Sequence, residues 1–379
     1  MRDIAAVGSD LDLGYLLAVS AAAVWTPRPL VACLRALGDA RRLVSCARGE
    51  RCIPDGCEPL SIDALARIAS VDDETASAAL AAASTHGDRF VAHSGADYPR
   101  RLRDLCDPPP VLYYRGSLAS LDTKTVAIVG SRAATPYGRS IAGTLASDLA
   151  GLGVTVVSGM ARGIDAAGHR ACVHAHAPTV AVIGSGLSVL YPPYHALLGD
   201  EIVAHGGAIL SEFPPTMPAR PHHFPMRNRL VAALADATVV VEGSYKSGAL
   251  ITARLAAELG RPVFAIPGDL GKATSEGTNA LIKDGAMLTT SAADMCAVLG
   301  WPIQVTRAND GLAQADDPIM EAIREAPADA ADISRASGIE IATVIARLTM
   351  LEIQGAAERL PGGFYAAVSR RKSANGRSS

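Results

Sequence analysis

Aromatic residues are scarce in this chain of 379 residues, and positive charge is not in excess. Aromatics make up 4% of the chain and hydrophobic residues 49%, so the apolar mass is aliphatic, as in packed helices and buried parallel strands. Lys and Arg number 35 against 38 Asp and Glu, for a formal net charge of −3. This balance excludes a globally basic binder of polyanions, so any such ligand must meet locally concentrated positive charge.

Cysteine pairs with the spacing of a metal site are also lacking. The seven cysteines are odd in number and scattered, which argues against a disulfide framework. Cys46, Cys52 and Cys57 cluster, but they form no CxxC pair and no histidine lies nearby. Ordinary reduced thiols are therefore favoured over a zinc site, and we expect no metal.

No hydrophobic run is long enough to suggest a membrane span. The apolar stretch Leu13–Trp25 follows Asp10 and Asp12, where a secretory signal would carry basic residues. We interpret the stretch as a buried helix, and we expect a cytoplasmic protein with no membrane partner.

Composition divides the chain into zones. Residues 1–90 are rich in Ala and Leu with helical periodicity, which predicts a small helical domain of the SAM or helix-hairpin-helix type. Residues 91–304 form the predicted α/β domain. A linker over 305–317 precedes a winged helix at 318–368, and 369–379 form a basic tail that we expect to be disordered.

The middle zone alternates short β-branched runs with segments of helical length. Near-continuous apolar strands suit a parallel sheet buried on both faces. Crossover helices are predicted at Tyr137–Leu152 and Leu250–Leu259, while Phe90–Leu118 has the pattern of a connector. The fold class is therefore α/β: an extended, Rossmann-like, doubly wound and mostly parallel sheet. The predicted strands are Val126–Val129, Val154–Val157, Thr179–Ile183, Ala208–Leu210, Ala237–Val241 and Val263–Ile266.

The C-terminal zone has the pattern of helices followed by a hairpin, which predicts a winged helix-turn-helix. Gly338 separates the second and third helices, and Pro361-Gly362-Gly363 suits the turn of a wing. The third helix, from about Glu340 to Glu352, carries Arg347 as its single basic residue. An acidic helix is poorly suited to the major groove, so protein contact or autoregulation is favoured over DNA binding.

Four regions near predicted strand ends combine small residues with a cation. The carboxyl ends of parallel strands face one crevice, where backbone amides, helix N-termini and cations can hold phosphate. We call each of these regions a phosphate cradle. A mononucleotide would need only one cradle, whereas several cradles side by side suit the backbone of a nucleic-acid strand. The residues are Gly130, Ser131, Arg132, Ser158, Gly159, Arg162, Arg227, Arg229, Lys246, Ser247 and Gly248.

The segment Arg220–Arg229 is the most informative in the chain. It holds three arginines and two histidines, and no acid occurs between Glu212 and Asp236. Such a run makes a local positive field in an otherwise acidic protein. Phe224 lies within it between prolines, and an aromatic beside arginines is what stacking on an unpaired base requires.

Two groups of ionisable residues invite a catalytic interpretation. Asp165 and His169 would share a helix face, but a helix cap with a packing histidine is favoured over a metal site or an acid–base pair. Glu242 could act as a catalytic carboxylate, although an ion pair that orients Arg227 or Arg229 is the favoured interpretation.

Several stretches of the middle zone occur together in one order: Val126–Arg132, Val157–Asp165, Tyr191–Pro193, Ser211–Pro215, Phe224–Arg229, Ser247–Ala253 and Ile266–Gly268. Together they resemble the DprA/Smf family of DNA-processing proteins, although the first 90 residues match only loosely. The resemblance implies an extended Rossmann domain that binds single-stranded DNA without catalysis and forms a homodimer. It also implies help in loading the RecA recombinase, and a role in natural transformation where the host is competent. The DNA contacts that it implies are Phe224 and the cradle residues named above.

Two other functions stay open. A nucleotide-processing enzyme of the phosphoribohydrolase type could use Glu242 as acid or base, although the PGGxGT-type loop of such enzymes is absent. Gly184-Ser185-Gly186 lacks the third glycine of the dinucleotide fingerprint, so no nicotinamide or other cofactor is expected. A transcription regulator would read promoters with its winged helix, and the acidic third helix argues against that function.

Overall fold

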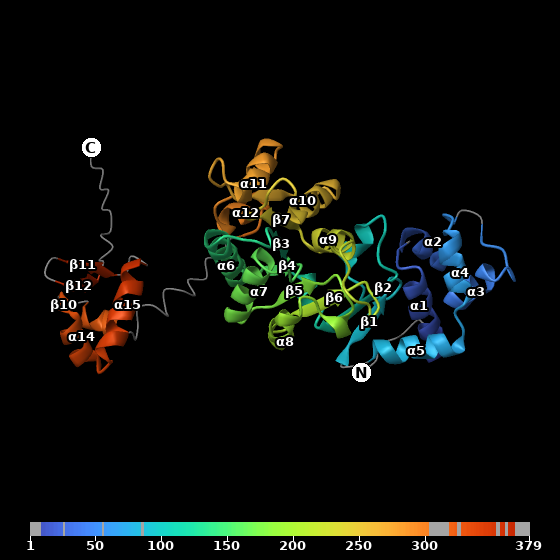
Figure 1. Ribbon diagram of the computed structural model, residues 1–379, viewed down its shortest axis with the longest axis horizontal. Coiled ribbons are helices and arrows are strands. Elements are labelled where there is room, and N and C mark those ends of the chain that lie inside the picture. Colours follow the sequence, from blue (N-terminus) through green and yellow to red (C-terminus); the bar gives the residue numbers. More distant parts are fainter. Residues whose placement is uncertain are drawn as a thin grey trace. The chain divides into compact units, whose positions relative to one another are not determined.

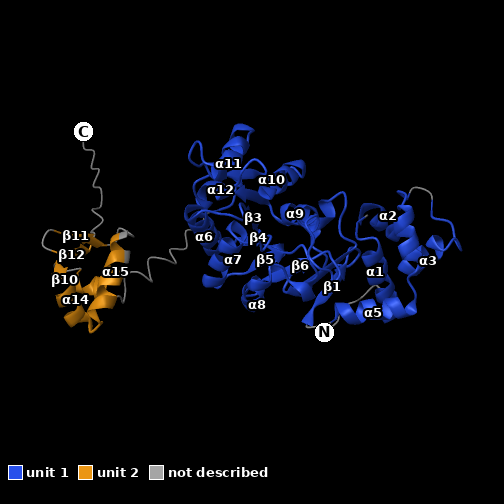
Figure 2. Ribbon diagram, viewed as in Figure 1, with its two compact units in different colours: residues 1–304 blue, residues 305–379 orange. Residues whose placement is uncertain are grey.

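The computed structural model divides the chain into two compact units, residues 1–304 and 305–379 (Figure 2). Among the described residues, no helix is both long and apolar enough to cross a bilayer. The described residues are 9–25, 27–54, 57–84, 87–302, 318–323, 327–353, 357–360 and 363–367.

The first unit opens with a helical region (Figure 1). Two of its helices, at Ile62–Ala69 and Asp73–Ala83, begin at side-chain caps: Ser61 accepts from the backbone N–H of Ala64, and Asp72 accepts from that of Thr75. The apolar stretch expected to form a buried helix does so, and its Leu17 is 1% exposed. The helices are α1 (Asp10–Ala22), α2 (Pro27–Leu37), α3 (Ala40–Ala47), α4 (Ile62–Ala69) and α5 (Asp73–Ala83).

A nine-stranded sheet follows, in the order β1-β2-β6-β5-β4-β3-β7-β8-β9. The neighbours from β6 to β9 pair in parallel, while β1 with β2 and β2 with β6 are antiparallel. The mostly parallel, doubly wound sheet predicted from the sequence is confirmed. The strands are β1 (Arg89–Ala92), β2 (Val111–Gly116), β3 (Thr125–Val129), β4 (Thr155–Ser158), β5 (Thr179–Val182), β6 (Ala208–Ser211), β7 (Ala237–Val240), β8 (Val263–Ala265) and β9 (Met287–Leu288).

Both faces of the sheet are buried, which explains the continuous apolar runs. In β3, Ala127 and Val129 pack into the core that includes α9 and α10, while Val126 and Ile128 pack into the core that includes α6. Short 3₁₀ helices lie at Arg100–Asp104, Ala119–Asp122, Leu187–Val189 and Pro193–His195. The helices of this domain are α6 (Pro136–Gly151), α7 (Ile164–His174), α8 (Ala196–Ala204), α9 (His223–Leu234), α10 (Gly248–Glu258), α11 (Ala273–Lys283) and α12 (Ala292–Val298).

One segment differs from its expected form. Residues 90–118, interpreted as a connector, contribute most of β1 and all of β2, which extend the sheet beyond β6. The prolines Pro108, Pro109 and Pro110 precede β2, where they cost no ladder hydrogen bond. A run of prolines therefore marked the start of a strand here.

The second unit has its own core, built around Ile319, Ile333, Val344 and Leu348. Gly338 ends α14 in the left-handed conformation, with φ of 69°, so the predicted boundary between the last two helices is confirmed. The linker over 305–317 and the tail over 369–379 lie outside the described residues. The elements are α13 (Pro318–Ala322), β10 (Ala328–Asp329), α14 (Ala330–Ser337), α15 (Ile341–Ile353), β11 (Ala357–Arg359) and β12 (Phe364–Ala367), with the strands in the order β10-β12-β11.

Candidate nucleic-acid interface

The strand order creates a topological switch point between β3 and β7. The chain winds outward from β3 to β6 in one direction and from β7 to β9 in the other, which leaves a crevice beyond the carboxyl ends of the central strands. A cleft of about 680 Å³ opens there. Most of the site residues expected from the sequence meet in it: Gly130, Ser131, Arg132, Gly159, Phe224, Arg227, Ser247 and Gly248.

An arginine and two aromatic rings form one wall of the cleft. The Arg132 guanidinium carbon lies 4.6 Å from the centre of the Phe224 ring, in a cation–π contact. The Tyr191 ring lies 5.7 Å from that of Phe224 and is 47% exposed. A charged group and partly open rings are thus held side by side, as phosphate binding and base stacking require.

Arg227 carries charge to the inner wall of the cleft. Its side chain is buried, and Nη1 donates to the carbonyl of Val182. Gly159 leaves room for it, since a Cβ at this position would lie 2.3 Å from Nη1 of Arg227 and the guanidinium would have to shift. Burial lowers the pKa of Arg227 to about 10, and the nearby Asp165 carboxylate opposes that shift. The side chain is therefore cationic at neutral pH, in a place where water screens it poorly.

The start of α10 also lines the cleft. Ser247 caps this helix by accepting from the backbone N–H of Ala249, and Gly248 is the first helical residue. Asn228 of α9 donates from Nδ2 to the Gly248 carbonyl at 3.2 Å. A helix N-terminus with small residues at its entrance is suited to an anion.

Arg229 does not belong to the cleft. Its guanidinium is bound by Glu212 at 2.6 Å and by Asp107 at 2.8 Å, and its side chain is 8% exposed. Burial by itself lowers the pKa of Arg229, but the two carboxylates outweigh burial and raise the pKa above its ordinary value. The charge expected to face a ligand is neutralised inside the protein.

The remaining predicted residues lie beside the cleft. Ser158 is buried, and its Oγ donates to the carbonyl of Ile128 at 2.6 Å. Arg162 and Lys246 are exposed on the loops that follow β4 and β7. These two cations can add to the local field without lining the cavity.

Glu242 has a different role from the ion pair proposed from the sequence. Its carboxylate accepts from the backbone N–H of Thr135 at 2.9 Å and from the Thr135 hydroxyl at 2.6 Å, at the start of α6. Gly138 makes room for it, because a Cβ there would lie 2.3 Å from the carboxylate. The Glu242 carboxylate therefore occupies the anion position at the N-terminus of α6, and it does not pair with Arg227 or Arg229, which have other partners.

Asp165 and His169 serve structure in the arrangement observed. Asp165 lies in the first turn of α7, where Gly163 is the cap residue, and its Oδ2 accepts from the backbone N–H of Ala161. His169 donates from Nδ1 to the Thr179 hydroxyl at 2.8 Å, since that hydroxyl donates onward to a backbone carbonyl. Asp165 is therefore not the helix cap, whereas the expected packing histidine is observed. No group of three or more metal-ligating side chains occurs in the described parts of the chain.

Acidification is expected to destabilise the protein through His169. Burial lowers the pKa of His169 to about 3, with His195 and Arg227 acting in the same direction. Because the folded-state pKa lies below the ordinary 6.5, stability is lost as the pH falls below about 6.5 and decreases further toward pH 3. Between pH 7 and 5 the loss should reach about 2 kcal/mol. Urea unfolding of the wild type and His169→Gln at both pH values checks this, because the variant should lose that much less. Equal losses would contradict it.

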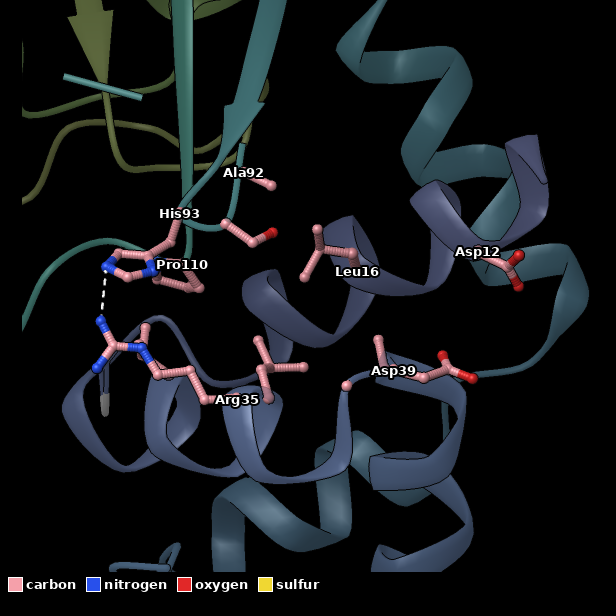
Figure 3. A pocket seen from close by; sticks show the side chains of 12 residues that line it. Asp12, Leu16, Arg35, Asp39, Ala92, His93 and Pro110 are labelled. Carbon is pink, nitrogen blue, oxygen red and sulfur yellow. Dashed lines mark hydrogen bonds between the residues drawn. The ribbon is translucent and has the colours of Figure 1, made fainter. Parts of the chain in front are cut away.

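A second cavity, of about 580 Å³, lies between the first helices and β1 (Figure 3). At one end Arg35 donates from Nη2 to Nε2 of His93 at 3.2 Å, and burial, aided by nearby arginines, lowers the pKa of His93 to about 4. The carboxylates of Asp12 and Asp39 lie at the other end. Because those carboxylates would repel a phosphate backbone, the switch-point cleft is the better nucleic-acid site.

Models of two known protein families match the chain. The family described as DNA recombination-mediator protein A matches residues 89–300, and the DprA winged helix domain matches residues 304–363. The chain belongs to the DprA/Smf family. Both the resemblance and the winged helix expected from the sequence are confirmed.

Two relatives of this family are more than a third identical to the chain over the aligned residues. Protein Smf of Escherichia coli is 36% identical over 279 residues, covering 70% of this chain and 74% of that protein. The putative DNA processing protein DprA of Mycobacterium tuberculosis H37Rv is 40% identical over 279 residues, covering 71% of each.

Solved DprA structures share the fold. That of Streptococcus pneumoniae DprA has a TM-score of 0.64 at 32% identity, and covers 76% of this chain and 98% of its own. The Helicobacter pylori DNA processing protein A, described as binding single-stranded DNA, has a TM-score of 0.50 at 32% identity over 56% of this chain and 95% of its own.

Arg220, Tyr191 and Asn228 are among the residues that line the cleft of this DprA-family chain but were not predicted as contacts from the sequence. Arg220 lies in the basic segment, Tyr191 belongs to a family-like stretch, and Asn228 separates the two buried arginines. The absence of acidic residues between Glu212 and Asp236 was a sequence signal that could have identified Arg220 as a cleft residue. Tyr191 could not be found in this way, because it comes from a loop distant in sequence.

Proposed function

We propose that the protein is a non-catalytic binder of single-stranded DNA that holds the strand in the switch-point cleft. The observation that carries this proposal is the joining of cationic and aromatic side chains at one cavity. Arg132, Arg220 and Arg227 line it against a single carboxylate among its described lining residues, Asp165. A net positive cleft in a protein of net charge −3 is what local phosphate binding needs.

The cleft suits a strand better than a single nucleotide. Arg132 and the N-terminus of α10 stand on different loops, so each can hold a different phosphate. The rings of Phe224 and Tyr191 can stack against bases that lie between those two phosphates, and every base can stack on an aromatic ring. Binding should therefore depend on salt and little on sequence. Family membership, and the single-stranded DNA binding described for the Helicobacter pylori relative, support the same function.

A nucleotide-processing enzyme is the weaker candidate. Its proposed acid or base, Glu242, is 5% exposed, and both of its carboxylate oxygens accept hydrogen bonds from Thr135. Release of free base from a nucleotide by the purified protein, lost in Glu242→Gln, would revive this alternative.

The wider role that we propose rests on the family. It comprises protection of incoming DNA, loading of RecA onto the bound strand, action as a cytoplasmic homodimer, and natural transformation in a competent host. For the winged helix we propose protein contact, since Ile341 and Ile345 of α15 are 46% and 48% exposed. Apolar groups on the exposed face of a helix suit a protein partner better than DNA.

Replacing Arg132 by alanine should weaken binding of oligo-dT by about fivefold to tenfold and reduce the salt slope by about one phosphate contact. Gel shifts and fluorescence anisotropy at several salt concentrations measure both. Arg170→Ala is the matched control, because Arg170 is exposed on α7 and does not line the cleft. Single-stranded oligonucleotides should bind more tightly than duplexes of equal length. Equal affinity of wild type and Arg132→Ala would overturn the assignment of the cleft.

A further inference from the structure

An indole from the helical region lies against the segment that forms one wall of the cleft. Trp25 is in the turn between α1 and α2, and its ring centre lies 5.1 Å from that of His222 and 5.1 Å from that of His223. It also lies 6.2 Å from the ring of Phe213. These contacts hold the indole beside the start of α9, although its own residue is nearly 200 positions earlier in the chain.

The contact leaves much of the indole open. Trp25 is 38% exposed, whereas His223 and Phe213, on which it rests, are fully buried. A tryptophan that only fastened two parts of a core would be expected to bury more of its large ring, since burial is where its stabilisation arises. An indole that is held by neighbouring rings and stays partly exposed is an aromatic group on which a base can stack.

The protein surface between Trp25 and the cleft is suited to an anion. Arg220 and Pro221 line the cleft and directly precede His222, which contacts Trp25. The first turn of α9 contains no acidic residue, and its cap residue, His222, makes no side-chain capping hydrogen bond. No acidic side chain of the first turn compensates the positive end of this helix dipole, and the exposed Arg220 is nearby in the chain. A phosphate can cross here while the bases on either side meet Phe224 and Trp25.

We infer that the single-stranded DNA site continues out of the cleft, across the start of α9, onto Trp25 of the helical region. This inference rests on the proposed function and extends it to a base-stacking contact outside the α/β domain. It gives the helical region a direct part in DNA binding, as the end of a longer path. Short strands would fill the cleft alone, and only longer ones would reach the indole.

Oligonucleotide length tests the inference. The strands are oligo-dT of about 5 and about 15 nucleotides, which span the site sizes of single-strand-binding folds. Trp25→Leu, which keeps apolar packing but loses the aromatic face, should weaken binding of the longer strand by about fivefold or more. It should leave the shorter one unchanged. Trp25→Phe should stay within about twofold of the wild type. Equal affinity of wild type and Trp25→Leu for the longer strand, or an equal loss for both lengths, would overturn the inference.

Fluorescence gives a second test that leaves Trp25 in place. The chain has two tryptophans, so Trp301→Phe makes Trp25 the sole reporter. The longer strand should quench its emission in step with binding measured by anisotropy, and the shorter one should bind without quenching. Binding of the longer strand with no quenching would overturn the inference. Arg132→Ala is run in parallel: if it weakens both lengths while Trp25 shows no effect, the proposed function stands and only its extension fails.

Discussion

Replacing Arg229 by alanine is expected to lower the free energy of unfolding by about 3–5 kcal/mol. The guanidinium is bound by Glu212, whose side chain is 2% exposed, and by Asp107. Without its partner, the Glu212 carboxylate would stay buried and uncompensated, which costs more than the ion pair itself contributes. Urea unfolding monitored by circular dichroism measures the loss.

The Arg229→Ala experiment needs two controls, a variant of an exposed ion pair and a measurement of DNA binding. Lys272→Ala breaks an ion pair between Lys272 and Asp269, whose side chains are 64% and 69% exposed, and should leave the free energy of unfolding close to that of the wild type. At a temperature where Arg229→Ala remains folded, its affinity for oligo-dT should match that of the wild type. A stable Arg229→Ala protein with weak DNA binding would show that this arginine faces the ligand after all.

Replacing Gly159 by alanine should weaken binding of single-stranded DNA by about tenfold to a hundredfold, with no change in the charge of the protein. The added Cβ would lie 2.3 Å from Nη1 and 2.7 Å from Cζ of Arg227, so the guanidinium must move from its place at the cleft. A poorly screened cation contributes more to phosphate binding than an exposed one, at about 1.5–3 kcal/mol for a charged hydrogen bond. The expected loss is therefore larger than that for Arg132→Ala.

Gly143→Ala is the matched control for this experiment. Gly143 lies within α6, and a Cβ there would meet its nearest neighbour at 4.0 Å, an ordinary contact. This variant should bind oligo-dT as the wild type does and be as stable or slightly more so. Anisotropy titrations of both variants, with their unfolding curves, separate a lost contact from a lost fold. Wild-type affinity in a folded Gly159→Ala protein would rule out Arg227 as a DNA contact.

Much of the α/β domain could be predicted because its signals are local. Buried parallel strands favour apolar runs rich in β-branched residues, such as Thr125–Val129, and those runs are visible without knowing their neighbours. The loops after them carry glycine and serine, because backbone must approach backbone or ligand closely at that rim. The two-residue strand β9 and the antiparallel pair β1 and β2 gave no comparable signal, since each depends on a partner strand for its pairing.

The two arginines of α9 illustrate what the local sequence could not predict. Arg227 and Arg229 are two residues apart, which on a helix of 3.6 residues per turn turns their side chains about 200° from each other. One reaches the cleft, and the other turns toward Glu212 and toward Asp107, which lies 122 positions away in sequence. The amino-acid pattern shows that the segment is basic, but it does not show which face of the helix meets a carboxylate.

The sequence by itself determined the class of fold, the central parallel strands, the small-residue loops and the family, because each of these depends on residues near one another in the chain. Only the tertiary structure decided that β3 and β7 are neighbours, that the cleft lies between their loops, and which cations remain there. The physical reason is that a charge acts according to its distance from other charges and from water, and folding sets those distances between residues far apart in sequence.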